Sequence, residues 1–334
     1  MLRTRVAATR LLSRRNRNPV ALAAVTLQPR QRASLIRRST VEDYVTNRFG
    51  CSAEEAVKFD KNNGGRASSA ERAKDSCDKL QQRLNLSDAQ LKKIVLNVPS
   101  VLSCSYEANT EPKLALLQRR LDLSEAELKK IVLKLPSVLG YSYEANVEST
   151  LAALQRRLDL SEVELKKIVL ASTAIFSHSY KSNLEPKLAL LQRRLDLSEA
   201  ELKKIVLTLP SVLGCSYEEN LQPTLAALQQ RLDLSEAELK KIVLRLPAVL
   251  AYSYEANIVP SLAALQRRLD LSDVELTKIV LASTAIFSHS YESNLEPNLA
   301  LLQRRLDLSD AELKKIVLGH STVLNLSYEA NIEP

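Results

Sequence analysis

The chain repeats one block of sequence with a period of 37 residues. Its signature, L-[DN]-L-S, recurs without insertion, with the serine at Ser87, Ser124, Ser161, Ser198, Ser235, Ser272 and Ser309. Repetition at a fixed period of this length is typical of folds in which similar units stack in a row and each contacts its neighbours. Such a fold presents the same side chains at regular intervals, which suits binding better than catalysis.

Each copy carries the pattern of two amphipathic helices. The stretch EAELKKIVLKLP has apolar residues at i, i+3, i+4 and i+7, and Ser124 with Glu127 forms a capping-box pattern, so we predict a first helix ending near Pro136. Asn146, present in every copy, is a candidate N-cap for a second helix. Two such helices bury their apolar faces only by stacking on neighbours. The expected fold is therefore all-α: an α-solenoid, or superhelical array, of helix-turn-helix repeats.

Composition divides the chain into three parts. Residues 1–38 contain ten Arg and no Asp or Glu, the composition of an organelle presequence, most like a mitochondrial one, with a retained basic tail as the alternative. An apolar run between Val20 and Leu27 is too short to span a membrane, so no insertion is expected. We assign residues 39–84 to an N-terminal cap and divergent repeat. Residues 85–334 form the seven repeats, the last incomplete.

The positive charge of the chain comes from its first segment. The formal charge is +8, and without the ten early Arg the rest holds 37 basic against 39 acidic side chains, about −2. Any basic surface on the repeats must therefore arise from how the charges are arranged.

The repeat L-x-L-S-x-x-E-L-x-K-I-V-L-x-x-P-x-V-L-x-x-S-Y-E-x-N-x-x-P-x-L-x-x-L resembles that of the mitochondrial transcription termination factor (mTERF) family. The lead-in VEDYVTNRFGCSAEEAVKF is similar to the opening of plant-type members. The resemblance covers residues 40–334. It implies an α-solenoid with two helices and a 3₁₀ turn per unit. Its groove would bind double-stranded DNA or RNA in mitochondria or plastids and regulate transcription, including its termination, or splicing or translation.

Cations at fixed spacing are the candidate nucleic-acid contacts, because phosphate binding needs positive charges along one surface. The second residue of a doublet in the second helix is always Arg, at Arg83, Arg120, Arg157, Arg194, Arg231, Arg268 and Arg305. The first residue is also Arg at Arg119, Arg156, Arg193, Arg267 and Arg304. For the invariant column, phosphate contact and a structural role are both open, since a cation at a helix C-terminus stabilises it and an Arg stem covers apolar surface.

Base readout needs positions that vary within a constant frame. The best column runs through Asn97, Lys134, Ala171, Thr208, Arg245, Ala282 and Gly319, and Asn97, Lys134, Thr208 and Arg245 are its candidate readers. Free drift at an exposed site is the alternative. Other outward positions are nearly identical, so we expect backbone and shape recognition with little base discrimination.

Other recurring side chains are assigned to the scaffold. The Lys doublet at Lys129 and Lys130 follows Glu125 and Glu127 at four and three residues, which predicts salt bridges within the first helix. The Tyr of each SYE motif, such as Tyr143, is expected to pack between layers.

No catalytic or metal site is expected. His178, His289, Cys104 and Cys215 occupy one repeat column, and side chains in adjacent layers start roughly 10 Å apart, too far to share a zinc ion. No Gly-rich phosphate loop, HExxH motif or Ser/His/Asp constellation occurs. We therefore expect a monomeric, non-enzymatic protein with no cofactor and no small-molecule substrate. A protein-binding scaffold of the same fold and location is the rival to nucleic-acid binding.

Overall fold

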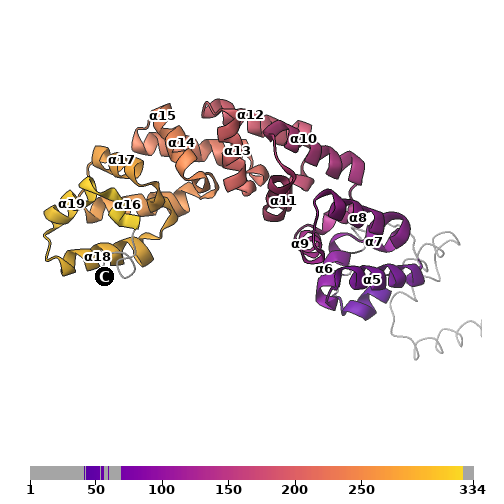
Figure 1. The fold of residues 1–334 in the computed structure, drawn as a ribbon. Helices are drawn as coiled ribbons and strands as arrows, with labels where there is room; N and C mark the ends of the chain where they lie inside the picture. Colours follow the sequence, from indigo (N-terminus) through magenta and orange to yellow (C-terminus); the bar gives the residue numbers. More distant parts are fainter. Residues whose placement is uncertain (1–40, 42, 53, 56–58, 60–68, 326–334) are drawn as a thin grey trace, which may run out of the picture. The chain divides into compact units, whose positions relative to one another are not determined.

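A computed structural model describes residues 41, 43–52, 54–55, 59 and 69–325. The presequence assigned to residues 1–38 and the last SYE motif with Tyr328 lie outside these residues. The chain divides into two compact units, one up to Tyr141 and one from Ser142. In the residues described, each unit is all-α, and successive helices stack along the unit as Figure 1 shows, which confirms the predicted solenoid of helical repeats.

Each repeat begins with a ten-residue first helix. These helices are α6 (Asp88–Asn97), α9 (Glu125–Lys134), α11 (Glu162–Ala171), α13 (Glu199–Thr208), α15 (Glu236–Arg245), α17 (Asp273–Ala282) and α19 (Asp310–Gly319). The second helices, preceded by the helix that leads into the first repeat, are α5 (Ala70–Leu84), α8 (Glu111–Arg120), α10 (Ser149–Leu158), α12 (Glu185–Arg194), α14 (Gln222–Leu232), α16 (Val259–Arg268) and α18 (Glu296–Arg305).

Two short turns connect the first helix to the second. The first turn is the short helix α7 (Ser100–Ser103) or a 3₁₀ helix: η2 (Pro136–Gly140), η4 (Thr173–Ser177), η6 (Pro210–Gly214), η8 (Pro247–Ala251), η10 (Thr284–Ser288) and η12 (Ser321–Asn325). The second is a π-helical turn: η1 (Tyr106–Thr110), η3 (Tyr143–Glu148), η5 (Tyr180–Leu184), η7 (Tyr217–Leu221), η9 (Tyr254–Ile258) and η11 (Tyr291–Leu295).

The first helices start where the capping boxes predict. Ser161 accepts a hydrogen bond from the Glu164 amide, and the Glu164 side chain accepts one from the Ser161 amide at 2.8 Å. The same reciprocal pair caps every first helix from α6 to α19, with Gln90 in place of Glu in α6. Two otherwise unpaired amides are thereby satisfied at each start.

The second helices start differently from the prediction. The side-chain cap lies one turn earlier: Ser142, the N-cap of η3, accepts from the Ala145 amide, and η3 leads directly into α10, whose own N-cap Glu148 makes no side-chain cap hydrogen bond. Asn146 is not the N-cap, because its Oδ1 accepts a hydrogen bond from the Ser142 amide at 3.2 Å. Serine and asparagine thus form a capping pair spaced for a π-helical turn. The Asn prediction was wrong because periodicity does not reveal that turn.

An acid or amide residue ends each second helix in the left-handed conformation. Asp159 has φ of 48°, and the next amide, of Leu160, reaches back to the Gln155 carbonyl at 2.9 Å. The same conformation recurs at Asn85, Asp122, Asp196, Asp233, Asp270 and Asp307. Asn and Asp tolerate positive φ better than other residues with a side chain, so the [DN] of the signature is the helix stop.

The core is a continuous apolar layer within each unit. In α11 the side chains of Leu165, Ile168 and Val169 are fully buried. In the second unit, α10 contacts α13, and α14 contacts both α15 and α17, so these second helices pack on first helices further along the chain. Among the described residues no helix is both long and apolar enough to cross a membrane.

Candidate nucleic-acid interface

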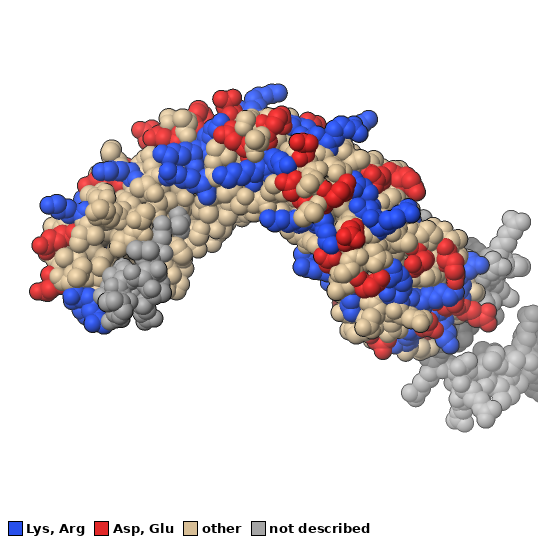
Figure 2. All heavy atoms as spheres, viewed as in Figure 1, with Lys and Arg blue, Asp and Glu red and all other residues tan. Residues whose placement is uncertain are grey.

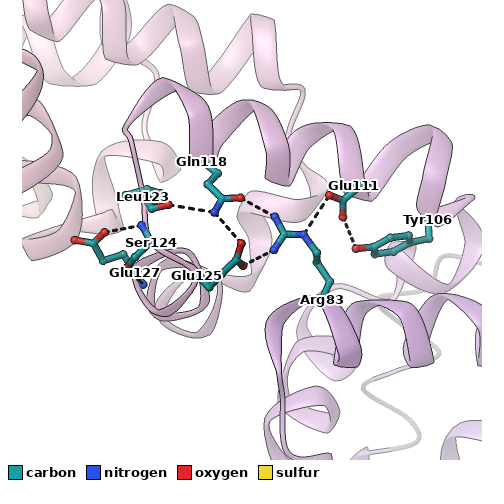
Figure 3. Close-up of polar contacts among 8 residues, drawn as sticks. All are labelled: Arg83, Tyr106, Glu111, Gln118, Leu123, Ser124, Glu125 and Glu127. Atoms are coloured by element: carbon teal, nitrogen blue, oxygen red, sulfur yellow. Dashed lines mark hydrogen bonds and ion pairs between the residues drawn. The ribbon is translucent and has the colours of Figure 1, made fainter.

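The invariant Arg column is turned toward later repeats. The Arg83 guanidinium contacts three acceptors: Glu111 through Nε at 3.1 Å, Gln118 through Nη2 at 2.6 Å, and Glu125 through Nη1 (Figure 3). These lie 28, 35 and 42 residues further along the chain. We call an Arg held at these offsets an Arg clamp. The clamp joins the end of one helix to the start and end of the next second helix and to the following first helix.

The Arg clamp recurs in the second unit. Arg157 donates to Glu185 at 3.2 Å, to Gln192 at 2.6 Å and to Glu199. Arg268 repeats the arrangement with Glu296, Gln303 and Asp310. Arg194 contacts Gln229 and Glu236, and Arg231 contacts Gln266 and Asp273, which are the acceptors at 35 and 42 residues only.

The guanidinium groups of the clamp are partly buried and are hydrogen-bonded within the protein. The side chains of Arg83, Arg157, Arg194, Arg231 and Arg268 are only 18–27% exposed. The Gln192 amide and the Arg157 guanidinium hold the pKa of Glu199 below its usual value. For these five Arg the contacts favour the structural interpretation. Of the other two members of the column, Arg120 is half-buried and Arg305 is exposed.

The first Arg of the doublet points outward. Arg119, Arg156, Arg193, Arg267 and Arg304 are all exposed. None of the five guanidinium groups forms a hydrogen bond or an ion pair with another residue in the ranges that the structure describes. Adjacent helix positions differ by about 100° in direction, which separates Arg156 from the clamp residue Arg157. This exposed Arg column has donors available for a ligand.

The candidate base readers lie on the outward face of the first helices. Asn97, Lys134, Thr208 and Arg245 are all exposed. Asn97 donates to the Lys93 carbonyl at 2.7 Å, and Arg245 donates to the Leu281 carbonyl at 2.6 Å. Four residues earlier in each first helix lies an exposed lysine: Lys93, Lys130, Lys167, Lys204, Lys241, Lys278 and Lys315. The variable column and this exposed Lys column therefore share one helix face.

The first Lys of several doublets contacts the preceding repeat, which periodicity did not reveal. Lys203 donates to the Asp159 carbonyl at 2.6 Å and pairs with Glu164 at 2.9 Å. Lys240 and Lys314 make the same two contacts, with Asp196 and Glu201 and with Asp270 and Glu275. The expected salt bridge within the first helix is thus replaced, for these three lysines, by one to the preceding repeat. Each lysine also satisfies a helix C-terminus.

The Tyr column and the column of Cys and His are buried to different degrees. Tyr106, Tyr143 and Tyr217 are buried, which confirms packing for these three. Cys104, His178, Cys215 and His289 are half-buried. In the described part of the chain, no group of three or more His, Cys, Asp or Glu side chains is placed to hold a metal ion.

Comparison with known families agrees with the repeat signature and the stacked two-helix unit. The mTERF family matches residues 79–334. The chain belongs to the mTERF family. No curated protein matches the sequence. Members of the family are in general organellar, nucleic-acid-binding regulators rather than enzymes.

The mTERF repeats of this chain carry charges of both signs. Figure 2 shows Lys and Arg interspersed with Asp and Glu on the face in view. Two large apolar side chains are also exposed on the first helices, Val163 at 78% and Val274 at 80%. They stand four residues before exposed lysines, Lys167 and Lys278, on the same face as the variable column.

Proposed function

We propose that this chain regulates organellar gene expression by binding the backbone of double-stranded DNA or RNA, with transcription termination as one such role. The observation that carries the proposal is the exposed Arg column, Arg119, Arg156, Arg193, Arg267 and Arg304, in a chain of a nucleic-acid-binding family. The exposed Lys column supplies further cations. The Arg-rich residues 1–38 favour import into the mitochondrion over the plastid.

Regular spacing of single cations suits a regular polymer. Phosphate contacts fix the position of a protein on a duplex without reading sequence. The array offers similar cations in every layer, whereas the positions that could read bases include Ala171, Ala282 and Gly319. Recognition of backbone and shape with little base discrimination follows from that surface.

The test is a salt series on the full-length chain with duplex DNA, duplex RNA and single-stranded RNA. Each phosphate contact contributes about −0.9 to the slope of log K against log salt on a duplex. Replacing Arg156, Arg193 and Arg267 with Gln should therefore flatten the slope by about 3. The basic first segment is present in every variant, so the difference in slope is the readout.

A control triple replaces the clamp residues Arg83, Arg157 and Arg268 with Gln. It should lower stability and leave the slope close to that of the wild type, since those guanidiniums contact carboxylates of the same chain. An unchanged slope in the exposed-Arg triple would contradict the proposed contact surface. Absence of salt-sensitive binding to every probe would contradict nucleic-acid binding itself.

The exposed Val163 and Val274, with the mixed surface charge, support a second function, that of a protein-binding scaffold. This function predicts a stoichiometric protein partner that survives nuclease treatment. Replacing Val163 and Val274 with Ser should release that partner without changing the fold, because both side chains are exposed.

A further inference from the structure

The Arg clamp is incomplete at two successive junctions. At Arg83, Arg157 and Arg268 the acceptor 28 residues on is Glu111, Glu185 and Glu296. Each of these carboxylates also accepts the hydroxyl of the preceding tyrosine, Tyr106, Tyr180 and Tyr291. The equivalent positions after Arg194 and Arg231 are Gln222 and Val259. The chain therefore lacks, at these junctions, the carboxylate that joins arginine to tyrosine elsewhere.

Two donors at the Arg194 junction are consequently unused. Arg194 Nε and the Tyr217 hydroxyl form no hydrogen bond with any residue that the structure describes. Gln222 is exposed and does not replace the carboxylate. Tyr217 as a whole is only 7% exposed. Among the described residues, however, Ser103 Oγ is the one fully buried side-chain N or O atom that lacks a hydrogen-bond partner, so neither Arg194 Nε nor the Tyr217 hydroxyl is fully buried. Both donor atoms are thus reachable from solvent.

A pocket lies at this junction. Its lining includes Arg193, Arg194, Tyr217 and Lys240 together with the carboxylates of Asp196 and Glu236. Glu236 is paired with Arg194 through Nη1, and Lys240 is paired with Glu201. Arg193, from the exposed Arg column, has no such pair in the described residues. Three of the lining residues therefore carry donor groups without a partner in the described residues: Arg194 at Nε, Tyr217 at its hydroxyl, and Arg193 at its whole guanidinium.

We propose that this pocket binds a phosphate group of the nucleic-acid backbone in the place that Glu185 occupies at the preceding junction. A phosphodiester, like a carboxylate, carries one negative charge and two acceptor oxygens, which fits the Arg194 Nε–H and the Tyr217 hydroxyl. Arg193 supplies the balancing charge. The site rests on the proposed function and adds one position where the backbone is held by a buried tyrosine as well as by surface cations.

The Arg231 junction is a weaker version of the same site. Arg231 and Tyr254 also lack the carboxylate, because Val259 replaces it. However, Gln230 stands where Arg193 stands in the Arg194 pocket. The balancing cation is missing, so the site is assigned to Arg194.

The chain supplies its own test, because the acceptors available to Arg157 and to Arg194 differ only at the position 28 residues on, which is Glu185 in one and Gln222 in the other. In the full-length protein, Gln222→Glu provides the internal carboxylate and should exclude phosphate. Duplex binding should weaken several-fold at low salt, and the salt slope should flatten by about 1. The mirror variant Glu185→Gln opens the preceding junction beside Arg156 and should steepen the slope by about 1. Acid at the first turn of a helix is favourable, so Gln222→Glu is expected to stay folded.

The outcomes separate this site from the proposed function. If the exposed-Arg triple flattens the slope but Gln222→Glu and Glu185→Gln leave it unchanged, the pocket is overturned and the proposed function stands. In a parallel experiment, inorganic phosphate is added to the wild type and to Gln222→Glu, and the thermal unfolding temperature of each is measured. Phosphate that stabilises the wild type but not Gln222→Glu, with unchanged duplex binding, would mark a site for free phosphate and overturn the backbone assignment. Loss of duplex affinity in Gln222→Glu and gain in Glu185→Gln together support it.

Discussion

Two adjacent arginines in α10, Arg156 and Arg157, lie in opposite environments. The Arg157 guanidinium donates to Glu185, Gln192 and Glu199, whereas the Arg156 guanidinium is exposed and has no hydrogen-bond partner in the described ranges. The difference is geometric, since one step along a helix turns the side chain by about 100°. Chemical identity alone therefore does not assign a role to either residue.

At this scale the pair gives a stability prediction. Arg157→Gln should lower the free energy of unfolding by about 1–2 kcal/mol, because it removes charged hydrogen bonds whose carboxylates are partly exposed. Arg156→Gln should change it by less than about 0.5 kcal/mol. Urea denaturation of the two variants checks this. Equal losses would show that the clamp contributes nothing specific.

At the scale of the element, the stop signal of the second helix is the left-handed Asp or Asn. Asp233 ends α14 with φ of 45° and is exposed. Its side chain makes no hydrogen bond with the described residues, so its conformational tolerance is the property that matters.

Substitutions at Asp233 should therefore follow backbone preference. Asp233→Val should cost about 1–2 kcal/mol, because a β-branched residue strongly disfavours positive φ. Asp233→Gly should be neutral or slightly stabilising, because glycine enters this conformation without strain. Thermal unfolding of both variants measures the order, and a Val variant as stable as the Gly variant would contradict it.

Elements were easier to predict from sequence than the contacts between them. The first helices, their capping boxes and the stacking followed from the 37-residue period. The clamp did not, because the period defines columns such as Arg157 and Glu199 without showing which columns meet after packing. For the same reason, the hydrogen bond from Lys203 to the Asp159 carbonyl could not be predicted from the sequence. Arg48 was also missed: it donates to Gln81, the equivalent of Gln118, although the lead-in has little of the repeat pattern.

For the whole molecule, the acidic residues determine how far the pH can fall before the fold loses stability. Backbone and lysine contacts hold the pKa of Glu164, Glu201 and Glu275 below the usual value, and amide and arginine contacts do so for Glu199 and Glu236. A depressed folded-state pKa means that the unfolded chain binds more protons, so the stabilisation is complete above the unfolded pKa of about 4.3 and is lost as pH falls through the folded values.

Stability should consequently fall most steeply below about pH 4.5, as many junctions lose their ion pairs together. The midpoint of urea denaturation between pH 7 and pH 3 measures this fall. The Arg83, Arg157 and Arg268 triple should show a shallower acid limb, because its clamp carboxylates have lost their cation. A midpoint that stays constant to pH 3 would contradict the assignment.

The constancy of the junction offsets has a consequence for how such a gene changes length. The Arg donors meet acceptors 35 and 42 residues further along at Arg83, Arg157, Arg194, Arg231 and Arg268, so removing or adding a multiple of 37 residues returns these donors to acceptors of the same kind. Residues 170–207 and 281–318 differ at only three positions, which makes them ready partners for recombination. Copying errors within the gene can therefore lengthen or shorten the array without creating a new interface.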